Sequence, residues 1–491
     1  MAFVNGNRQT YLYSLNVYRT VNIDKSIFRD NDIRGVYGAQ LNNHVARMVG
    51  LGLGSELEEG EEVAIGYDMR TSSPTLALSL ASGLTEAGCN VVMHGLITTP
   101  LLYFSTVHQK VRVGLMVTAS HLPLDHNGFK IAREGIAYTY EKLISKIERR
   151  VLGNEFKRPD WSKLGSYSYD AGVVNEYISF ISSKIKPERK LKIVVDVGSG
   201  SCWFARPVIE RVGFTVRVVN DAPSGLEGVP RVDPLKPETL SSLRQLVLEE
   251  GADMGVALDP DADRVGLVDD RGRIVLPDHI ALLLISSVIR KKKSCRALLY
   301  YGLSPSVADY ATELGAEVFG VRAGHSYIQE KIFDLRAEVA SEANGHYYLA
   351  DDFYGFDDGL YVALRVAEEV SSQARRLSDI IDSLPQIVAP PTEIHIPVPG
   401  NMRDAMVDSV AEYAESAGFG VKRMVGVRVE MDDGWFFIRR SGSEDSIVLR
   451  YGSSSRDKAD TIRKELEAIL EKVFKKFGII YGRKIGNAHV Y

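Results

Sequence analysis

Short apolar runs alternate with longer stretches of helical periodicity along most of the chain. Three segments repeat one order: an apolar strand, a helix that ends near a glycine, a second strand, a third strand and a polar loop. The segments begin at V-A-I-G-Y-D (63–68), I-V-V-D-V-G (193–198) and A-L-L-Y-Y-G (297–302). Alternating strand and helix signals predict mainly parallel sheets with helices on both faces.

Each repeat ends in its loop richest in polar side chains. These loops are T-A-S-H (118–121), D-P-D-A-D-R (259–264) and E-A-N-G-H (342–346). Ligands of such sheets bind outside the carboxyl ends of the strands, where these loops lie. We therefore expect the three loops to face a common central cleft.

The last part of the chain follows a different pattern. P-Q-I-V-A-P-P-T-E-I-H-I-P-V-P (385–399) holds five prolines and predicts a linker, because proline cannot continue a helix or lie in mid-sheet. Alternating strand patterns and a closing amphipathic helix, roughly 456–477, follow. The expected fold is α/β: three similar α/β domains with mixed, mainly parallel sheets around a central cleft, plus a smaller C-terminal α+β domain. The expected spans are 1–167, 168–272, 273–387 and 388–491.

Composition excludes several classes of partner. Hydrophobic residues make up 45% of the chain and charged residues 25%, as in ordinary soluble proteins, and the net charge of −5 favours neither nucleic acid nor an anionic membrane. Three scattered cysteines predict neither a disulfide framework nor a zinc site. No signal-peptide pattern opens the chain, and the longest apolar stretch, 280–289, is too short to span a bilayer. We expect a cytoplasmic protein with small-molecule partners.

The D-P-D-A-D-R loop is the candidate metal site. Asp259, Asp261 and Asp263 alternate, so an extended loop would direct three carboxylates to one side, which suits Mg²⁺. An EF-hand also begins D-x-D-x-D but needs glycine at its sixth position and glutamate at its twelfth, where this chain has Arg264 and Asp270. A solvated acidic turn is the plainer alternative.

The segment T-A-S-H-L-P-L-D-H-N-G-F-K (118–130) brings a hydroxyl, an imidazole and an ammonium together. Beside a divalent cation, the Ser120 oxygen or its phosphate ester would be a fourth ligand and a phosphoryl donor. Lys130, after an expected turn at Asn127–Gly128, would polarise a phosphoryl oxygen or manage a proton. The alternatives are a helix N-cap for Ser120 and a surface position for Lys130.

Two further motifs suggest substrate contacts. Glu342 and Asn344 alternate, so both side chains would face sugar hydroxyls, and His325 and His346 would bind substrate or shuttle protons, unless they are structural histidines. R-R-S-G-S-E (439–444) has the composition of a phosphate-binding nest, although Ser-Gly is also common in hairpin turns.

Together these motifs resemble the α-D-phosphohexomutase superfamily, nearest to its phosphomannomutase/phosphoglucomutase branch, over nearly the whole chain. F-R-D-N-D-I-R-G (28–35) is similar to the family's opening motif and 118–130 to its phosphoserine loop. Residues 259–264 resemble its magnesium loop, G-H-S (324–326) and 342–346 its sugar loops, and 439–444 its phosphate loop.

The resemblance implies a phosphotransferase that interconverts hexose 1-phosphate and hexose 6-phosphate of mannose or glucose. Phosphorylated Ser120 would donate its phosphate to give a hexose 1,6-bisphosphate intermediate, which also serves as an activator. The implied catalytic residues are Ser120, His121, Lys130, Arg34 and Arg264, and the implied Mg²⁺ ligands are Ser120, Asp259, Asp261 and Asp263. The implied substrate-binding residues are His325, Ser326, Glu342, Asn344, His346, Arg439, Ser441, Gly442 and Ser443.

Four positions depart from the family pattern. Leu122 stands where asparagine is usual, Asn31 replaces a tyrosine and Asn344 a serine. Gly302 appears where many relatives carry a lysine after the strand. These departures keep open three alternatives: a phosphoglucosamine mutase, an Mg²⁺-dependent sugar phosphatase, and a catalytically silent sugar-phosphate-binding protein. The sequence leaves open whether the protein is a monomer or a dimer.

Overall fold

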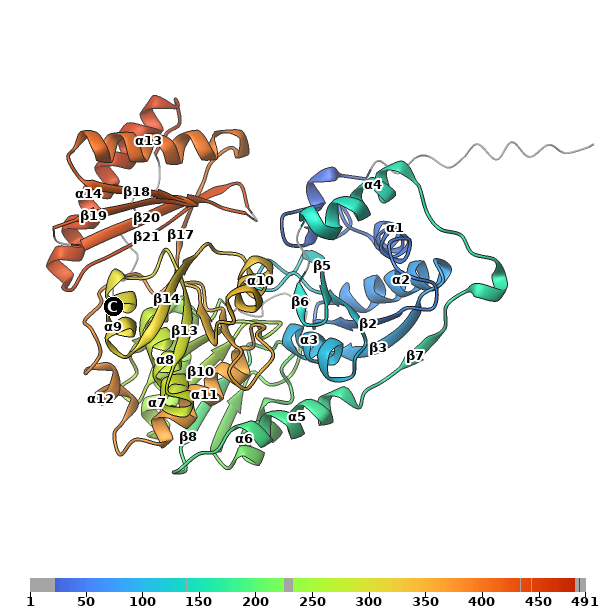
Figure 1. Ribbon diagram of the computed structural model, residues 1–491, viewed down its shortest axis with the longest axis horizontal. Helices are drawn as coiled ribbons and strands as arrows, with labels where there is room; N and C mark the ends of the chain where they lie inside the picture. The colour runs from blue at the N-terminus through green and yellow to red at the C-terminus, as the bar shows by residue number, and fades with distance from the viewer. Residues whose placement is uncertain are drawn as a thin grey trace, which may run out of the picture.

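The computed structural model describes residues 23–137, 140–224, 233–432, 434–442, 444–481 and 485. Four β-sheets follow one another along the chain. Figure 1 shows the first sheet in blue and cyan on one side, the second and third in green and yellow beside it, and the fourth in red beyond the third. The arrangement confirms the predicted fold class of three α/β units and a C-terminal α+β unit.

The first sheet has strand order β1-β5-β4-β2-β3-β7, with β6 paired to β5. Strands β2, β3, β4 and β7 are parallel, whereas β5 runs antiparallel to β1, β4 and β6. The strands are β1 Ile33–Val36, β2 Glu62–Tyr67, β3 Asn90–Leu96, β4 Val113–Val117, β5 His126–Arg133, β6 Ile136–Ala137 and β7 Tyr167–Tyr169. The helices are α1 Asn43–Gly54, α2 Ser73–Glu86, α3 Thr99–His108 and α4 Ser145–Gly153, with short turns η1 Lys25–Ile27, η2 Tyr140–Ile144 and η3 Trp161–Lys163.

The second and third sheets share a mixed topology. Their orders are β12-β11-β10-β8-β9 and β14-β13-β15-β16, and in each the central parallel strands are extended by an antiparallel hairpin. The second comprises β8 Lys192–Asp196, β9 Thr215–Val219, β10 Met254–Leu258, β11 Val265–Asp269 and β12 Ile274–Val275, with α5 Val173–Lys184, α6 Ala205–Val212 and α7 Pro237–Glu250. The third comprises β13 Cys295–Tyr300, β14 Ala316–Val321, β15 Val339–Ser341 and β16 Tyr347–Leu349, with α8 Pro277–Lys292, α9 Pro305–Glu313, α10 His325–Leu335, α11 Gly359–Ser371 and α12 Leu377–Ile381.

The fourth sheet, β17-β21-β20-β19-β18, is antiparallel throughout. It comprises β17 Ile394–Pro397, β18 Gly420–Met424, β19 Gly426–Met431, β20 Gly434–Arg440 and β21 Ser446–Gly452, with η4 Gly400–Met402, α13 Arg403–Ser416 and α14 Arg456–Lys476. The predicted closing helix is confirmed as α14.

Two local expectations were wrong. The proline-rich stretch 385–399 is not linker throughout, because its residues 394–397 form β17, an edge strand, where proline is tolerated. Asn127 and Gly128 lie inside β5 and form no turn. A Cβ at Gly128 would lie 2.4 Å from the carbonyl oxygen of Ile33, so glycine allows β1 to approach β5 there.

Helix α11 joins the second and third sheets. It packs against β10 and β11 as well as against α8, and every one of its residues is buried. Because α11 covers apolar side chains of both units, neither unit can separate from it without exposing part of its core to water. Strand β7 extends the first sheet to Tyr169, two residues beyond the expected end of the first domain at residue 167. The four domain spans remain predictions. Within the described residues, no helix has both the length and the apolar character needed to cross a membrane.

A buried ion pair attaches the fourth sheet to the third unit. Arg450 of β21 and Asp278 of α8 are both fully buried, and the Arg450 guanidinium donates to both carboxylate oxygens of Asp278. The same guanidinium donates to the carbonyl of Gly302 at 3.1 Å, and Asp278 accepts the Ser304 amide at 2.8 Å. These contacts fix the position of the fourth sheet relative to the end of β13.

We predict that Arg450→Met lowers the free energy of unfolding by about 3–5 kcal/mol, because it leaves the Asp278 charge buried and uncompensated. Urea unfolding followed by the fluorescence of Trp435, which is buried and lies 5.9 Å from the Arg450 guanidinium, measures the change.

Two further variants interpret that result. Lys422→Met, which breaks the exposed pair with Glu430, should change the free energy of unfolding by less than about 0.5 kcal/mol. Arg450→Met combined with Asp278→Leu should recover much of the lost stability, because no charge is then left alone. An unchanged urea midpoint in Arg450→Met would show that the pair does not anchor the fourth sheet.

Candidate active site

Ser120 lies in a constrained loop directly after β4. Its φ of +50° is in the left-handed region, which is unfavourable for a residue other than glycine. The loop is held by Arg70, which is fully buried and donates to the carbonyls of Ser120 at 2.6 Å and Leu122 at 2.8 Å. Thr118 accepts the Ser120 amide at 2.9 Å and donates to Asp68 at 2.8 Å. Ser120 therefore caps no helix, and its hydroxyl is held at the end of the strand.

The three aspartates are brought together differently from the expectation. The loop between β10 and β11 is a tight turn and not an extended segment: the Ala262 amide donates to the Asp259 carbonyl at 3.0 Å, and Ala262 has a φ of +58°. The turn gathers Asp259, Asp261 and Asp263, all buried, so that one carboxylate oxygen from each lies within 4.8 Å of the others.

The serine and the aspartates meet across two sheets. The Ser120 hydroxyl donates to Asp259 Oδ2 at 2.9 Å and lies 3.2 Å from His121 Nδ1. From the same sheet as Ser120, Lys130 of β5 donates to Asp261 at 2.8 Å and also to Asp263. The hydroxyl, the ammonium and the carboxylates thus form one buried cluster, with the half-buried imidazole of His121 beside it.

The cluster fits a hard divalent cation. Asp261 Oδ1 and Asp263 Oδ1 are buried and, among the described residues, accept no hydrogen bond. Burial and the neighbouring carboxylates of Asp263 and Asp261 raise the pKa of Asp259 well above its ordinary value. Oxygen ligands with excess negative charge are what Mg²⁺ prefers, and such an ion would supply the partner that these oxygens lack.

A second chain of contacts extends from the aspartate turn. Arg264 donates from Nε to His346 Nε2 at 3.0 Å, and His346 Nδ1 lies 2.7 Å from Asp357 Oδ2. Asp357 is buried beside Gln329, so the His346 ring is fixed from both sides. In the first sheet, Arg34 is buried, and its Nη2 lies 2.5 Å from Asp32 Oδ2.

The two expected sugar loops also lie side by side. Glu342 is buried, accepts from the Tyr348 hydroxyl at 2.9 Å, and contacts the Asn344 amide and the Gly324 amide, each at 3.4 Å. Asn344 therefore turns toward Glu342. His325 begins α10, and burial lowers its pKa to about 4, so its ring is neutral near pH 7. The Ser326 hydroxyl is buried without a partner among the described residues.

The expected phosphate loop follows β20. Ser441 is buried and accepts the Glu444 amide at 3.1 Å, and a Cβ at Gly442 would lie 3.6 Å from Asp30 Oδ2, so the loop closes toward the first unit. Arg439 pairs with Glu393 at 2.9 Å. Ser443 lies outside the described residues.

The departure at Gly302 has a steric cause. A Cβ built there would lie 2.4 Å from Cε1 of the buried Tyr300 ring, so any side chain would collide with it. The Tyr300 hydroxyl instead donates to Glu393 at 2.6 Å and accepts from Arg439. The Tyr300 ring therefore occupies the space that a side chain at residue 302 would need at the end of β13.

Sequence reasoning missed several residues that hold the site. Thr99, the first residue of α3, donates to Asp261 Oδ2 at 2.6 Å, and its amide donates to the Asp261 carbonyl at 3.0 Å. The T-T-P sequence at 98–100, a helix-start signal that follows a strand, could have indicated it. Arg70, Asp357 and Tyr300 carry no comparable local signal. Arg70 pairs with Asp68 nearby, but the serine loop that it holds lies 50 residues further along the chain, and Tyr300 is 93 residues from Glu393.

Comparison with known proteins agrees with these motifs. Models of the alpha/beta/alpha domains I, II and III of phosphoglucomutase/phosphomannomutase match residues 25–158, 175–272 and 276–388. A "Phosphomannomutase/phosphoglucomutase" of Pseudomonas putida is 33% identical over 88% of this chain and 92% of its own length. A "Probable phosphoglucosamine mutase" of Methanothermobacter thermautotrophicus is 31% identical over 91% of this chain and 98% of its own length.

The fold agrees as well. The crystal structure of a phosphoglucomutase/phosphomannomutase family protein from Burkholderia thailandensis matches 92% of this chain and 98% of its own, with a TM-score of 0.82 and 30% identity. Matches to three successive domain models, to curated relatives along nearly their whole lengths and to this structure place the protein in one family. The chain belongs to the phosphoglucomutase/phosphomannomutase family of the α-D-phosphohexomutase superfamily.

Proposed function

We propose that this protein is an Mg²⁺-dependent phosphohexomutase that interconverts the 1- and 6-phosphates of mannose, glucose or both, with Ser120 as carrier of the phosphoryl group. The observation that carries the proposal is the 2.9 Å contact of the Ser120 hydroxyl with Asp259 inside a buried cluster of three aspartates and Lys130. A nucleophilic oxygen beside concentrated carboxylates and a fixed cation suits phosphoryl transfer.

Asp259, Asp261, Asp263 and the Ser120 oxygen would hold the ion. When bound, Mg²⁺ neutralises charge on the phosphoryl group in transit. Thr99 keeps Asp261 in place, and Lys130 contributes a fixed positive charge on the side facing the first sheet.

The residues of this chain divide the transfer among them. The bond between phosphorus and the Ser120 oxygen breaks as a hexose hydroxyl oxygen bonds to the phosphorus, and the hydroxyl proton passes to a basic side chain of the cluster. His121, whose Nδ1 lies 3.2 Å from the Ser120 hydroxyl, is the candidate for that proton, whereas both ring nitrogens of His346 already face Arg264 and Asp357. Arg34 and Arg264 add positive charge around the reacting phosphate.

Substrate recognition would come from the third and fourth units. His325, Ser326, Glu342, Asn344 and His346 line the expected sugar loops, and Arg439, Ser441, Gly442 and Ser443 form the expected phosphate loop. A hexose 1,6-bisphosphate would be both the intermediate and the activator that keeps Ser120 phosphorylated. The side chains of the sugar loops would set which hexose is preferred. The proposed substrates are sugar phosphates of the cytoplasm.

We predict that Ser120→Ala lowers the rate of conversion of glucose 1-phosphate by roughly a thousandfold or more, because it removes the oxygen that carries the phosphoryl group. A coupled assay with Mg²⁺ and a trace of glucose 1,6-bisphosphate measures the rate, and intact mass reports the bound phosphate.

The matched control is Ser183→Ala, at an exposed serine of α5, which should leave the rate unchanged. The same assay follows inorganic phosphate. Release of phosphate without mutase turnover would indicate a sugar phosphatase, and full mutase activity in Ser120→Ala would remove Ser120 as the carrier.

Asp261→Asn should raise the Mg²⁺ concentration needed for half-maximal activity by about tenfold or more and lower the maximal rate, because one oxygen ligand loses its charge. Asp457→Asn, at an exposed aspartate in the first turn of α14, is the control and should change neither value. A Mg²⁺ titration identical to that of the unmodified protein would contradict the assignment of the metal site.

A further inference from the structure

A cavity of about 380 Å³ lies where the first, third and fourth units meet. Its walls include Asp30 and Glu141 from the first unit, the loop after β14 from the third, and α13, β18 and β20 from the fourth. Arg322, Arg423, Arg439 and Arg440 line it. Four carboxylates, those of Asp30, Glu141, Asp404 and Asp408, line the same cavity. An anionic ligand would therefore need an arginine that these and other carboxylates do not already pair with.

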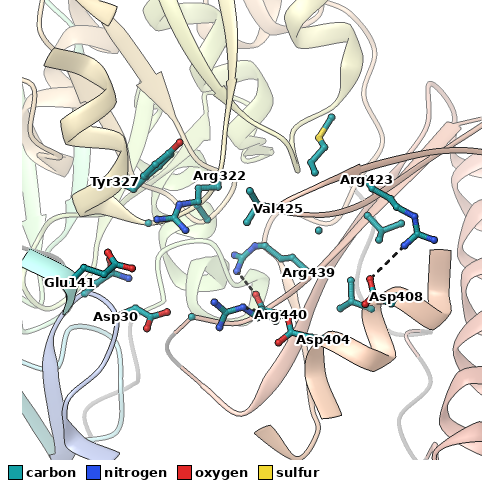
Figure 2. A pocket seen from close by; sticks show the side chains of 18 residues that line it. Asp30, Glu141, Arg322, Tyr327, Asp404, Asp408, Arg423, Val425, Arg439 and Arg440 are labelled. Carbon is teal, nitrogen blue, oxygen red and sulfur yellow. Dashed lines mark hydrogen bonds and ion pairs between the residues drawn. The ribbon is translucent and has the colours of Figure 1, made fainter. Parts of the chain in front are cut away.

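Two of the four arginines pair with acids of α13. Arg423 lies 3.5 Å from Asp408 and 3.2 Å from Glu415, and Figure 2 shows it directed away from the middle of the cavity. Arg440 lies 3.6 Å from Asp404 in a more exposed position. Both guanidinium groups therefore have carboxylate partners on α13.

Arg439 is the phosphate-binding residue expected from the R-R-S-G-S-E motif, but the nitrogens of its guanidinium all bond to other residues of the protein. Its Nη2 donates to both oxygens of Glu393 at 2.9 and 3.1 Å, its Nε donates to the Tyr300 hydroxyl, and its Nη1 donates to the Arg440 carbonyl at 3.2 Å. Glu393 is buried. Releasing Arg439 to a ligand would leave that buried carboxylate without its cation, which is costly.

Arg322 differs from the other three. In the described part of the chain it forms no ion pair and no hydrogen bond, and its Nε is buried without a partner. It is nevertheless fixed, because its guanidinium carbon lies 4.2 Å from the centre of the Tyr327 ring. Figure 2 shows Arg322 reaching the cavity from the side opposite Arg440.

The local fold explains this placement. Val321 ends β14 beside Tyr300 of β13, so Arg322 leaves the carboxyl edge of the third sheet next to the strand end at which Gly302 carries no side chain. Gly324, with a φ of +129°, then turns the chain into α10. The positive charge of Arg322, which follows β14, therefore lies at the same sheet edge as the end of β13.

We propose that Arg322 is a further substrate-binding residue, which binds the non-reacting phosphate of the hexose phosphate, while Arg439 holds Glu393 and the phosphate loop in position. The inference rests on the proposed function and deepens it. A planar guanidinium stacked on Tyr327 presents parallel N–H groups that match two phosphate oxygens. Gly442 of the expected phosphate loop lines the same cavity.

The other arrangement open to Arg322 is purely structural. Asp30 and Glu141 face the same cavity, so Arg322 would then only balance their charge and hold the units together. In that arrangement its removal changes stability and leaves the affinity for phosphate groups unaltered. Binding and unfolding measurements on the same variants separate the two arrangements.

The test measures the binding of glucose 6-phosphate to the full chain carrying Ser120→Ala, by isothermal titration, so that no turnover intervenes. Arg322→Met should weaken binding by about tenfold or more, because a charge-assisted contact to phosphate is lost while the apolar stem remains over Tyr327. Arg322→Lys should restore part of the affinity, since it keeps the charge but loses the planar fork. Inorganic phosphate should compete less effectively in Arg322→Met, whereas glucose should compete in neither protein.

Arg423→Met is the matched control: it removes a charge from the same cavity and should leave the affinity within about twofold, because the Arg423 guanidinium is directed toward the acids of α13 and away from the middle of the cavity. Unchanged affinity in Arg322→Met, with or without a change in the urea midpoint, would overturn the proposal. So would a loss confined to Arg439→Met.

Kinetics on chains with intact Ser120 separate this proposal from the proposed function. If the protein is a mutase, Arg322→Met should raise KM for both glucose 1-phosphate and glucose 6-phosphate, because the same phosphate site serves both orientations of the sugar. Mutase activity with unchanged KM values would overturn the role of Arg322 and leave the function standing. Binding that depends on Arg322 in a protein without mutase activity would support the site and reject the function.

Discussion

The buried contact between carboxylates of one sheet and an ammonium of another is the constraint on which the rest of the structure depends. Asp261 and Asp263 lie on the hairpin of the second sheet, and Lys130 comes from β5 of the first. All three are nearly inaccessible to water. Unpaired charges in such a place would be strongly unfavourable, so the two units must meet in one orientation. That orientation also brings Ser120 to Asp259.

The same principle recurs at two further junctions between units. His346 of the third unit receives Arg264 of the second, and Arg450 of the fourth sheet reaches Asp278 of the third unit. Each contact joins a charged side chain from one unit to an oppositely charged or polar group in the next. Polar contacts therefore set the alignment of the units, and apolar packing also crosses their boundaries: one buried cluster includes Phe104 of the first unit, Tyr177 of the second and Phe437 of the fourth.

Because charged contacts hold the units together, the arginines of the site fall into two groups: those that pair with buried carboxylates and those that do not. A buried arginine that balances a carboxylate is part of the scaffold, as Arg439 is with Glu393. Arg322 lies over the Tyr327 ring and, among the residues that the structure describes, forms no ion pair, so its hydrogen-bonding groups would be available to a ligand. Residue type and motif position do not separate these two cases, because the difference lies in the partners.

The sequence by itself determined the repeated strand and helix order, the polar loops at the strand ends, and the residue types of the site, since periodicity and turn chemistry are local. It misjudged the aspartate loop and the Asn127–Gly128 pair, because a left-handed residue at 262 and the approach of β1 to β5 depend on neighbouring strands. Only the tertiary structure decided that Ser120 meets Asp259, that Arg70 holds the serine loop and that Tyr300 excludes a side chain at Gly302. The physical reason is that these contacts join residues far apart in sequence, whose pairing is fixed only when the units pack.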